Sequence, residues 1–187
     1  MADVLVLVDI QRDYFRGGRM PLVGPDDAAE RAGNLLGHFR ARGLPVIHVR
    51  HESLESDATF LVAGTPGAEF DSRVIPRAGE AVIVKHHPNS FLETDLRAEI
   101  ERHPDASLVV AGMMTSMCVD ATVRAASDLG YDVSVVADAC AAPDLEFAGT
   151  HVAGHAVHAA FIRALGDAYA DVVMTADVVS PPADELR

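Results

Sequence analysis

Three side chains with complementary chemistry stand at the ends of apolar segments in this sequence. Asp9 and Lys85 each end such a segment directly, and Cys118 follows another after the short turn GMMTSM. A thiolate is a nucleophile, a carboxylate can carry a proton, and an ammonium can hold both anions in place. If the fold brings these segment ends together, the three residues predict a site for nucleophilic catalysis.

Lys85 is unusual because it is the only lysine beside 14 arginines. Arginine therefore supplies nearly every surface cation of this chain. Arginine stays protonated in a protein, whereas lysine can lose its proton. One lysine can survive by chance, but its position at the end of an apolar segment favours a chemical role.

Cys118 is expected at the first turn of a helix that follows a strand and a tight turn. The helix dipole, its free N–H groups and a nearby ammonium would all favour the thiolate, so we expect a lowered thiol pKa. The N–H groups of the turn would also suit a developing oxyanion. The alternative is an inert thiol packed as a small apolar group.

Asp9 follows five apolar residues, and a carboxylate in such a place is costly to bury without a partner. Lys85 is the natural partner. A structural ion pair, or a carboxylate that caps backbone N–H groups, would account for Asp9 equally simply. The functional interpretation is a general acid and base that takes the thiol proton and passes it to the leaving nitrogen.

Apolar strand-like runs alternate with helix-like segments along the whole chain. This alternation predicts an α/β fold in three α/β/α layers, with a doubly wound, Rossmann-like, mainly parallel sheet of six strands. Ligands of such sheets bind beyond the carboxyl ends of the strands, where all three reactive residues fall. The expected strands are Val4–Asp9, Pro45–Val49, Ala81–Val84, Ser107–Ala111, Val133–Ala137 and Val172–Thr175. The expected helices are Asp26–Ala41, Leu92–Arg102, Cys118–Leu129 and Phe147–Leu165.

The length of 187 residues predicts one domain that spans residues 1–187. Within it, residues 51–80 break the alternation and carry few periodic residues. A stretch of this length without a long element is usually a lid, a binding loop or an oligomer contact.

Composition narrows the class of function. A net charge of −13 repels phosphate backbones, so nucleic-acid binding is not expected. No apolar run approaches the roughly 20 residues that span a bilayer, and no signal peptide is recognisable. Two cysteines do not make a disulfide scaffold, so the cytoplasm is the expected compartment.

Three motifs in order resemble the isochorismatase-like hydrolase superfamily, in its cysteine hydrolase (amidohydrolase) branch. They are VLVDIQRDYF, VIVKHHPNSFLETDL and VVAGMMTSMCVDATVRAASDLGYDVSVVADAC, and the tail HAVHAAFIRAL also fits. The resemblance implies a catalytic triad of Asp9, Lys85 and Cys118, and a cis peptide at Met113–Met114. It also implies an oxyanion hole formed by the N–H groups of Met114 and Cys118, a thioester intermediate, no cofactor and a homo-oligomer.

Two differences from known branches of the superfamily narrow the expected reaction and cofactor. Isochorismatases proper cleave a vinyl ether and lack the cysteine, so Cys118 points to hydrolysis of a small amide, carbamoyl or ureido C–N bond. Nicotinamidases carry an Asp-x-His metal motif where this chain reads HVRHES, so no metal is expected. The alternatives are a vinyl-ether hydrolase, a thiol redox protein using Cys118 and Cys140, and a non-catalytic protein on the same fold.

Residues near the triad in sequence are candidates for substrate contact, although plain core packing explains each aromatic residue about as well. Among the aromatic residues, Phe91 is the best candidate because it closely follows Lys85. The substrate-binding candidates are Gln11, Phe15, His51, Phe60, Phe91, Met113 and Met117. His151, His155 and His158 would share one face of the last long helix, as a weak metal stripe or as part of an oligomer contact.

Overall fold

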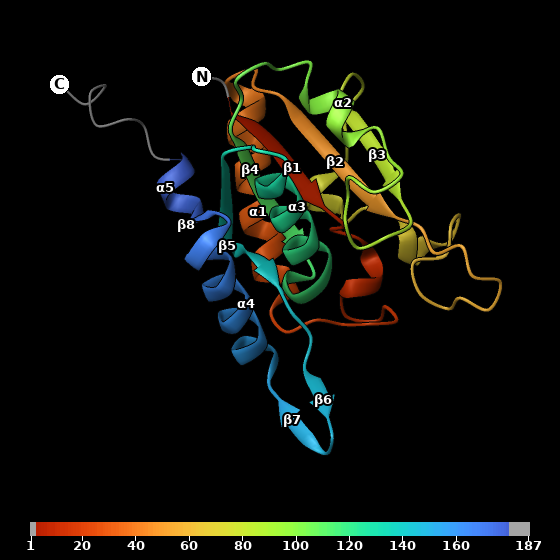
Figure 1. Cartoon of the computed structure of the whole chain (residues 1–187). Helices are drawn as coiled ribbons and strands as arrows, with labels where there is room; N and C mark the ends of the chain where they lie inside the picture. Colours follow the sequence, from red (N-terminus) through yellow and green to blue (C-terminus); the bar gives the residue numbers. More distant parts are fainter. Residues whose placement is uncertain (1–2, 180–187) are drawn as a thin grey trace.

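A computed structural model describes residues 3–179 of the chain, and its centre is a six-stranded parallel sheet (Figure 1). The strands lie side by side in the order β3-β2-β1-β4-β5-β8, and every neighbouring pair is parallel. Their bounds are β1 Val4–Val8, β2 Val46–His51, β3 Ala81–Lys85, β4 Leu108–Met113, β5 Val133–Ala141 and β8 Asp171–Val173. All six predicted strands are present.

Helices cover both faces of this sheet, so the predicted three-layer α/β/α architecture is confirmed. One face packs against α1 (Pro25–Ala41) and α5 (Thr175–Val179), and the other against α2 (Leu96–Ile100), α3 (Asp120–Asp128) and α4 (Gly154–Ala168). In β1, Leu5 and Leu7 face the α1 side of the sheet. Val4, Val6 and Val8 face the α3 side. Both faces are buried, which is why the strand reads as a continuous apolar run.

The order of the strands reverses beside β1. The chain builds β2 and β3 outward on one side of β1, and then returns to place β4, β5 and β8 on the other side. The carboxyl ends of β1 and β4 therefore diverge into loops that run to opposite halves of the sheet. Such a switch point opens a crevice where α/β proteins bind their ligands.

The helices expected over Leu92–Arg102 and Cys118–Leu129 have different bounds in the structure. The helix expected over Leu92–Arg102 is limited to Leu96–Ile100. The helix expected from Cys118 begins earlier, with a wide turn at Thr115–Val119 that continues into α3. Cys118 therefore lies in the first turns of a continuous helical segment, as expected.

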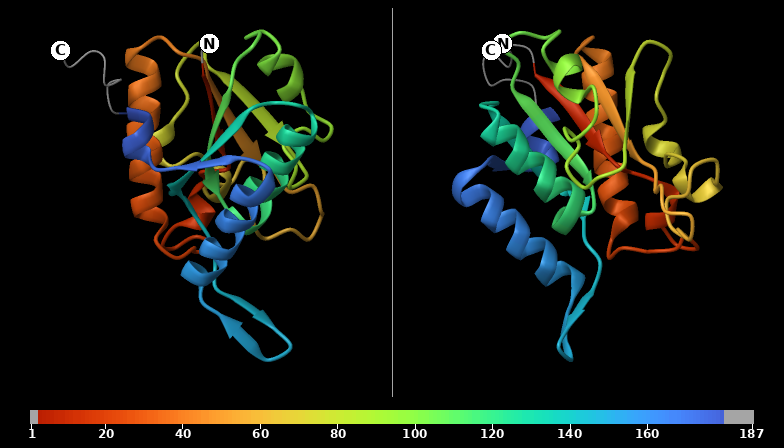
Figure 2. Two further views of the ribbon diagram at one scale, coloured as in Figure 1. Left: turned by 60° about the vertical axis from the view of Figure 1, so that its left-hand side comes forward. Right: turned by 45° about the vertical axis from the view of Figure 1, so that its right-hand side comes forward.

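The start of the predicted helix Phe147–Leu165 is wrong. Residues before Gly154 form an antiparallel hairpin of β6 (Leu145–Phe147) and β7 (Thr150–Val152), which extends away from the body of the molecule (Figures 1 and 2). Ala148 and Gly149 both have positive φ angles, which a two-residue hairpin turn requires. The helical pattern of the sequence holds only from Gly154 onward.

The segment between β2 and β3 is irregular, as predicted, with only two short 3-10 helices at Pro66–Ala68 and Ser72–Val74. Its second half is tied to the segment after β1. The N–H of Arg12 donates to the Glu69 carbonyl, and the N–H of Leu61 donates to Oδ2 of Asp13. Residues 54–59 are mostly exposed and form a tip closed at its base by bonds from Ser53 to Phe60 and Leu61. Whether the segment serves as a lid or an oligomer contact stays a prediction.

No helix within residues 3–179 is long and apolar enough to cross a membrane.

Candidate active site

The carboxyl edge of the sheet brings Asp9, Lys85 and Cys118 together. Nζ of Lys85 lies 2.7 Å from Oδ2 of Asp9 and 3.2 Å from Sγ of Cys118. Asp9 and Lys85 are completely buried, and Cys118 is 5% exposed. An acid, an amine and a thiol therefore share one small, nearly dry site.

Lys85 reaches this site from two strands away. β3 is separated from β1 by β2, and neighbouring strands lie about 4.8 Å apart. His51 at the end of β2 pairs in register with Lys85, and the lysine side chain crosses over it toward Asp9. Nζ lies 3.1 Å from Nδ1 of His51 and 3.0 Å from the His87 carbonyl oxygen. Four acceptors thus fix an ammonium that has three protons.

Gly112 allows β4 to lie closely against β1 beside the site. Its φ is 146°, and a Cβ atom at this position would overlap the backbone of Val8. Only glycine combines this backbone angle with such a close approach. The approach sets the position of the turn that leads from β4 to Cys118.

The carboxylate of Asp9 is held by its ion pair and by the backbone around it. Asp9 has a φ of 50°, its N–H donates to Val49, and its carbonyl accepts from the N–H of Gln11. Its Oδ2 lies 2.7 Å from the Lys85 ammonium, and the whole side chain is buried. The carboxylate therefore depends on Lys85 for its charge balance.

Burial decides which groups of the triad are charged at rest. It raises the pKa of the Cys118 thiol, the Asp9 charge raises it further, and Lys85 only partly opposes both. Burial also raises the pKa of Asp9. Burial alone would lower the pKa of Lys85, but Asp9 and Cys118 more than reverse this and raise it.

One ammonium can neutralise one anion in a dry site, and a second anion is costly. The resting triad is therefore an ionised Asp9–Lys85 pair beside a neutral Cys118 thiol. The expectation of a lowered thiol pKa is wrong, because burial and the carboxylate outweigh the helix and the lysine.

The turn before Cys118 has the cis peptide bond that the resemblance implied, between Met113 and Met114. Met113 is completely buried at the end of β4, so it does not line an open pocket. Met114 caps the helical segment that carries Cys118, and its carbonyl accepts from the N–H groups of Met117 and Val119. The oxyanion role of the Met114 and Cys118 N–H groups stays a proposal.

Gln11, expected to contact substrate, instead braces the site. Nε2 donates to the carbonyls of His51 and Ala68, at 2.9 and 2.8 Å, and Oε1 accepts the His51 N–H. Both amide protons are thus used, and the side chain is completely buried. Gln11 fixes the backbone of His51, whose ring contacts Lys85, and His51 remains a candidate for substrate contact.

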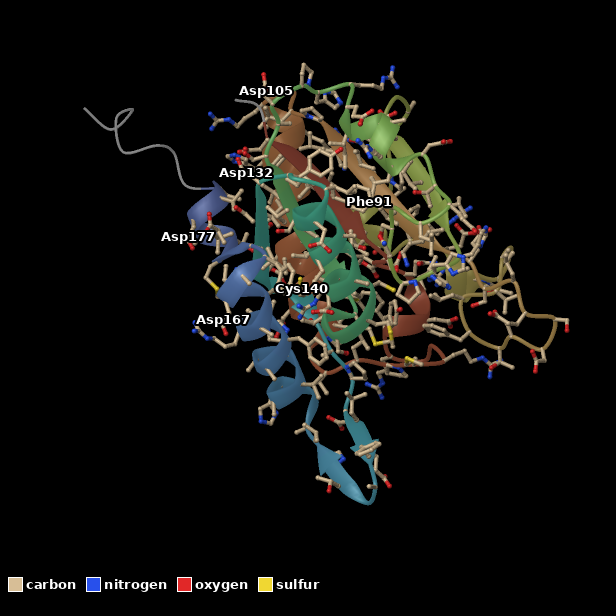
Figure 3. All side chains as sticks on the ribbon, viewed as in Figure 1. Phe91, Asp105, Asp132, Cys140, Asp167 and Asp177 are labelled. Atoms are coloured by element: carbon tan, nitrogen blue, oxygen red, sulfur yellow. The ribbon has the colours of Figure 1, made fainter. Side chains whose placement is uncertain are left out.

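Two of the aromatic candidates lie in the core. Phe15 is 8% exposed in the α1-side core, with the guanidinium of Arg73 over its ring. Phe91, which is labelled in Figure 3, packs against the α3-side core, and its ring stacks on that of Tyr131 with 6.1 Å between the centroids. Both rings therefore have core contacts, and a role of either in substrate binding stays a prediction.

Phe60 and Met117 remain candidates for the entrance. Phe60 lies at the base of the exposed tip, with its ring edge-on to Tyr14 at 5.3 Å. Met117 is 48% exposed in the turn that carries Cys118. Tyr14, which the sequence did not single out, is buried, and burial followed by the charges of Cys118 and Asp9 raises its pKa.

The other histidine and cysteine candidates lie outside this group. His151 is on β7, so the predicted stripe does not lie on one helix, and His158 instead contacts Oγ1 of Thr115 through Nδ1 at 3.0 Å. Cys140 lies within β5, behind α3 in the view of Figure 3, and is 6% exposed. Burial raises its pKa to about 12, and both cysteines are free thiols.

Asp9, His51 and Cys118 also have the donor types of a metal site. Their ligand atoms lie within 4.8 Å of one another, the one such cluster in the described part of the chain. Lys85 Nζ, however, contacts all three residues, at distances of 2.7 to 3.2 Å. The covalently attached ammonium occupies the position that a cation would need.

Comparison with known proteins gives a consistent result. The model of the isochorismatase domain matches residues 3–177. The chain is 46% identical to YddQ of Bacillus subtilis, an uncharacterized isochorismatase family protein, over 94% of this chain and 97% of that protein. It is 34% identical to the secreted isochorismatase effector Isc1 of Verticillium dahliae, over 76% and 74% of the two chains.

A relative with a named reaction and a solved structure complete the comparison. Maleamate amidohydrolase of Pseudomonas putida is 30% identical over 71% of this chain and 68% of its own. The crystal structure of a hydrolase from Oleispira antarctica, described as a putative isochorismatase, superposes with a TM-score of 0.91. It is 46% identical and covers 96% of this chain and 97% of its own.

Proposed function

Because the chain belongs to the isochorismatase family of hydrolases, we propose that it hydrolyses a small amide, carbamoyl or ureido C–N bond through a Cys118 thioester. The observation that supports this proposal most strongly is the buried contact of one ammonium with both a carboxylate and a thiol. Lys85 lies 2.7 Å from Asp9 and 3.2 Å from Cys118, so one cation can balance a negative charge on either residue.

The first half of the reaction forms the thioester. Cys118 Sγ attacks the substrate carbonyl carbon while its proton passes to the carboxylate of Asp9. The negative charge moves from Asp9 to sulfur and then to the carbonyl oxygen, and Lys85 remains protonated throughout. The oxyanion is bound by the N–H groups of Met114 and Cys118. Asp9 then returns its proton to the leaving nitrogen, and the C–N bond breaks.

The second half releases the acid. Asp9, ionised again, takes a proton from a water molecule, whose oxygen attacks the thioester carbonyl. The tetrahedral intermediate collapses, the C–S bond breaks, and the proton on Asp9 returns to sulfur. The cycle restores the ionised Asp9–Lys85 pair and the neutral thiol. A neutral resting thiol suits this scheme because its deprotonation is coupled to attack on a bound substrate.

A C–N bond is favoured over a vinyl ether for two reasons. Vinyl-ether hydrolysis needs a proton donor but no nucleophilic sulfur, whereas Cys118 lies directly against the cation of the site. Maleamate amidohydrolase, an enzyme named for C–N hydrolysis, is also among the relatives. The same cluster supports a reaction without a metal, since Lys85 supplies the positive charge.

A substrate panel tests the proposal. Small amides, carbamoyl compounds and ureido compounds are assayed for released ammonia or amine, and a vinyl ether such as isochorismate for released pyruvate. We expect nitrogen release by the wild type, none by Cys118→Ala, and a transient acyl adduct on the Cys118 peptide by mass spectrometry. Vinyl-ether turnover that persists in Cys118→Ala would overturn the proposal. Full hydrolysis by Cys140→Ser would exclude the thiol redox alternative.

A further inference from the structure

Two buried hydroxyl groups link the segment that follows Lys85 to the helix that carries Cys118. Oγ of Ser90 lies 2.7 Å from Oγ1 of Thr122, and the N–H of Ser90 donates to the same Thr122 oxygen at 3.1 Å. Ser90 is completely buried, and Thr122 is 1% exposed. The two residues are 32 positions apart in the sequence, so this Ser90–Thr122 link joins separate parts of the fold.

Both ends of the link lie close to the triad along the chain. Thr122 follows Cys118 by four residues in the helical segment that leads into α3, so both side chains lie on the same side of that segment. Ser90 follows His87 by three residues, and the His87 carbonyl oxygen accepts a hydrogen bond from Nζ of Lys85 at 3.0 Å. The link therefore connects the support of the ammonium to the support of the sulfur.

The segment between β3 and α2 needs such an anchor. Residues 86–95 form turns and bends without a helix or strand, and they run beside α3 (Figure 1). Bonds within the segment, such as that from Oγ1 of Thr94 to the Ser90 carbonyl at 2.5 Å, shape it without placing it against the helix. The stacking of Phe91 on Tyr131 is a contact between apolar rings, and apolar contact is non-directional. Hydrogen bonds demand both distance and angle, so the Ser90–Thr122 link sets the position more narrowly.

The distance that this position controls is the one between the ammonium and the sulfur. Nζ of Lys85 lies 3.2 Å from Sγ of Cys118. Burial and the charge of Asp9 both oppose a negative charge on this sulfur, and Lys85 is the group that favours it. Attraction between opposite charges weakens as their separation grows. A shift of the ammonium away from the sulfur would therefore destabilise the thiolate and leave the neutral thiol nearly unaffected.

We propose that Ser90 and Thr122 are positioning residues that act through Lys85, by holding its ammonium against the sulfur while Cys118 carries negative charge. Neither hydroxyl takes part in a chemical step, since each is bonded to the other and Thr122 also accepts the Ser90 N–H. The role in turnover rests on the proposed function, whereas the first test uses only the reactivity of the thiol.

The rate of Cys118 alkylation by iodoacetamide, measured by peptide mass spectrometry on the full-length protein, tests the link without a substrate. Thr122→Val keeps the shape of the side chain and removes its hydroxyl. We expect labelling about 3- to 10-fold slower at a fixed pH, which corresponds to an increase of about half to one unit in the thiol pKa. Thr122→Ser keeps the hydroxyl and should restore the wild-type rate. Ser90→Ala keeps the backbone bond and should slow labelling less.

Two controls separate positioning from a general loss of packing. Thr175→Val also removes a buried hydroxyl, one that donates to Asp138 at 2.8 Å on the opposite face of the sheet, and it should leave the rate unchanged. In a Lys85→Met background, Thr122→Val should no longer change the rate, because the group through which it acts is gone. Thermal unfolding confirms that each variant is folded, and Ser90→Ala carries the test if Thr122→Val is not.

Unchanged or faster labelling of Cys118 in Thr122→Val would overturn the proposal, as would an equal slowing in the Lys85→Met background. Steady-state hydrolysis of an amide from the substrate panel gives a second readout. We expect kcat to fall while KM stays near the wild-type value, because the charge on sulfur develops after binding. A rise in KM alone would overturn the proposal. A wild type that hydrolyses nothing in the panel would refute the proposed function, while the labelling rates still decide the positioning role.

Discussion

Lys85 donates a hydrogen bond to the ring of His51, with Nζ 3.1 Å from Nδ1. An ammonium has only donors, so Nδ1 is the acceptor and the ring proton resides on Nε2. Burial and the charge of Lys85 lower the pKa of His51 to about 4. At neutral pH the ring is therefore uncharged and offers one N–H group beside the triad, which suits a substrate carbonyl or carboxylate.

Replacement of Lys85 by arginine is expected to reduce kcat/KM by more than about 100-fold. The guanidinium is planar and larger, and it cannot place one charge within contact of Asp9, Cys118 and His51 in a completely buried space. The measurement is steady-state hydrolysis of a substrate from the amide panel. Arg102→Lys, at an exposed ion pair, is the matched control and should be neutral. Near-normal activity of Lys85→Arg would contradict the role given to the lone lysine.

The alkylation of Cys118 by iodoacetamide should respond in opposite directions to two substitutions. Asp9 raises the pKa of the thiol and Lys85 lowers it. Asp9→Asn should therefore speed labelling near neutral pH although it abolishes turnover, and Lys85→Met should slow labelling. Peptide mass spectrometry after a brief pulse gives both rates, with Cys140 as the internal control. Fast wild-type labelling below about pH 7, well under the free thiol pKa of about 8.5, would instead show a resting thiolate.

His51→Gln should change how stability depends on pH. The pKa of His51 is about 4 in the folded chain and 6.5 when unperturbed, so the unfolded chain binds the proton first as pH falls. Above pH 6.5 the ring is neutral in both states and does not change the free energy of unfolding. As pH falls from 6.5 toward 4, the unfolded wild type gains a proton and its free energy of unfolding decreases. We expect a loss of about 2 kcal/mol relative to His51→Gln, with allowance for the partly exposed ring. Urea unfolding at several pH values measures it, and parallel curves for the two proteins would refute it.

Dialysis against a strong chelator should leave activity unchanged. The three possible ligands Asp9, His51 and Cys118 already surround the ammonium of Lys85, which a metal ion would have to displace. Activity is measured before and after dialysis, with a zinc-dependent hydrolase treated in parallel. Loss of activity that added zinc restores would show that the site uses a metal after all.

The positions of the strands and the convergence of the triad residues could be predicted from the sequence because each depends on local signals. Strands buried on both faces read as apolar runs, and parallel strands must end at one edge, so Asp9, Lys85 and Cys118 had to converge. The direction in which the fold shifts the pKa of the Cys118 thiol could not be predicted from the sequence. The helix and the lysine are visible in the sequence, but the 5% exposure of Cys118 and its nearness to Asp9 are products of packing.

The failures have a common cause in tertiary contacts. Gln11 reads as a polar residue beside a catalytic one, yet its partners His51 and Ala68 are 40 and 57 residues away. The stacking of Phe91 on Tyr131 is likewise a contact that its position after Lys85 did not indicate. The hairpin was missed because Phe147 and His151 fit a helical period, and the turn at Ala148–Gly149 was not recognised.

The segment between β2 and β3 has a part that is hydrogen-bonded to the body of the protein and a part that is exposed. Hydrogen bonds from Gln11 to Ala68 and from Leu61 to Asp13 attach part of this segment to the residues that follow β1. Residues 54–59 instead form an exposed tip, and a hydrogen bond from Ser53 to Phe60 closes its base. Insertions or exchanges confined to that tip would leave Lys85 and its partners in place. The exposed tip can therefore change in length or sequence without disturbing the ammonium that Asp9, Cys118 and His51 surround.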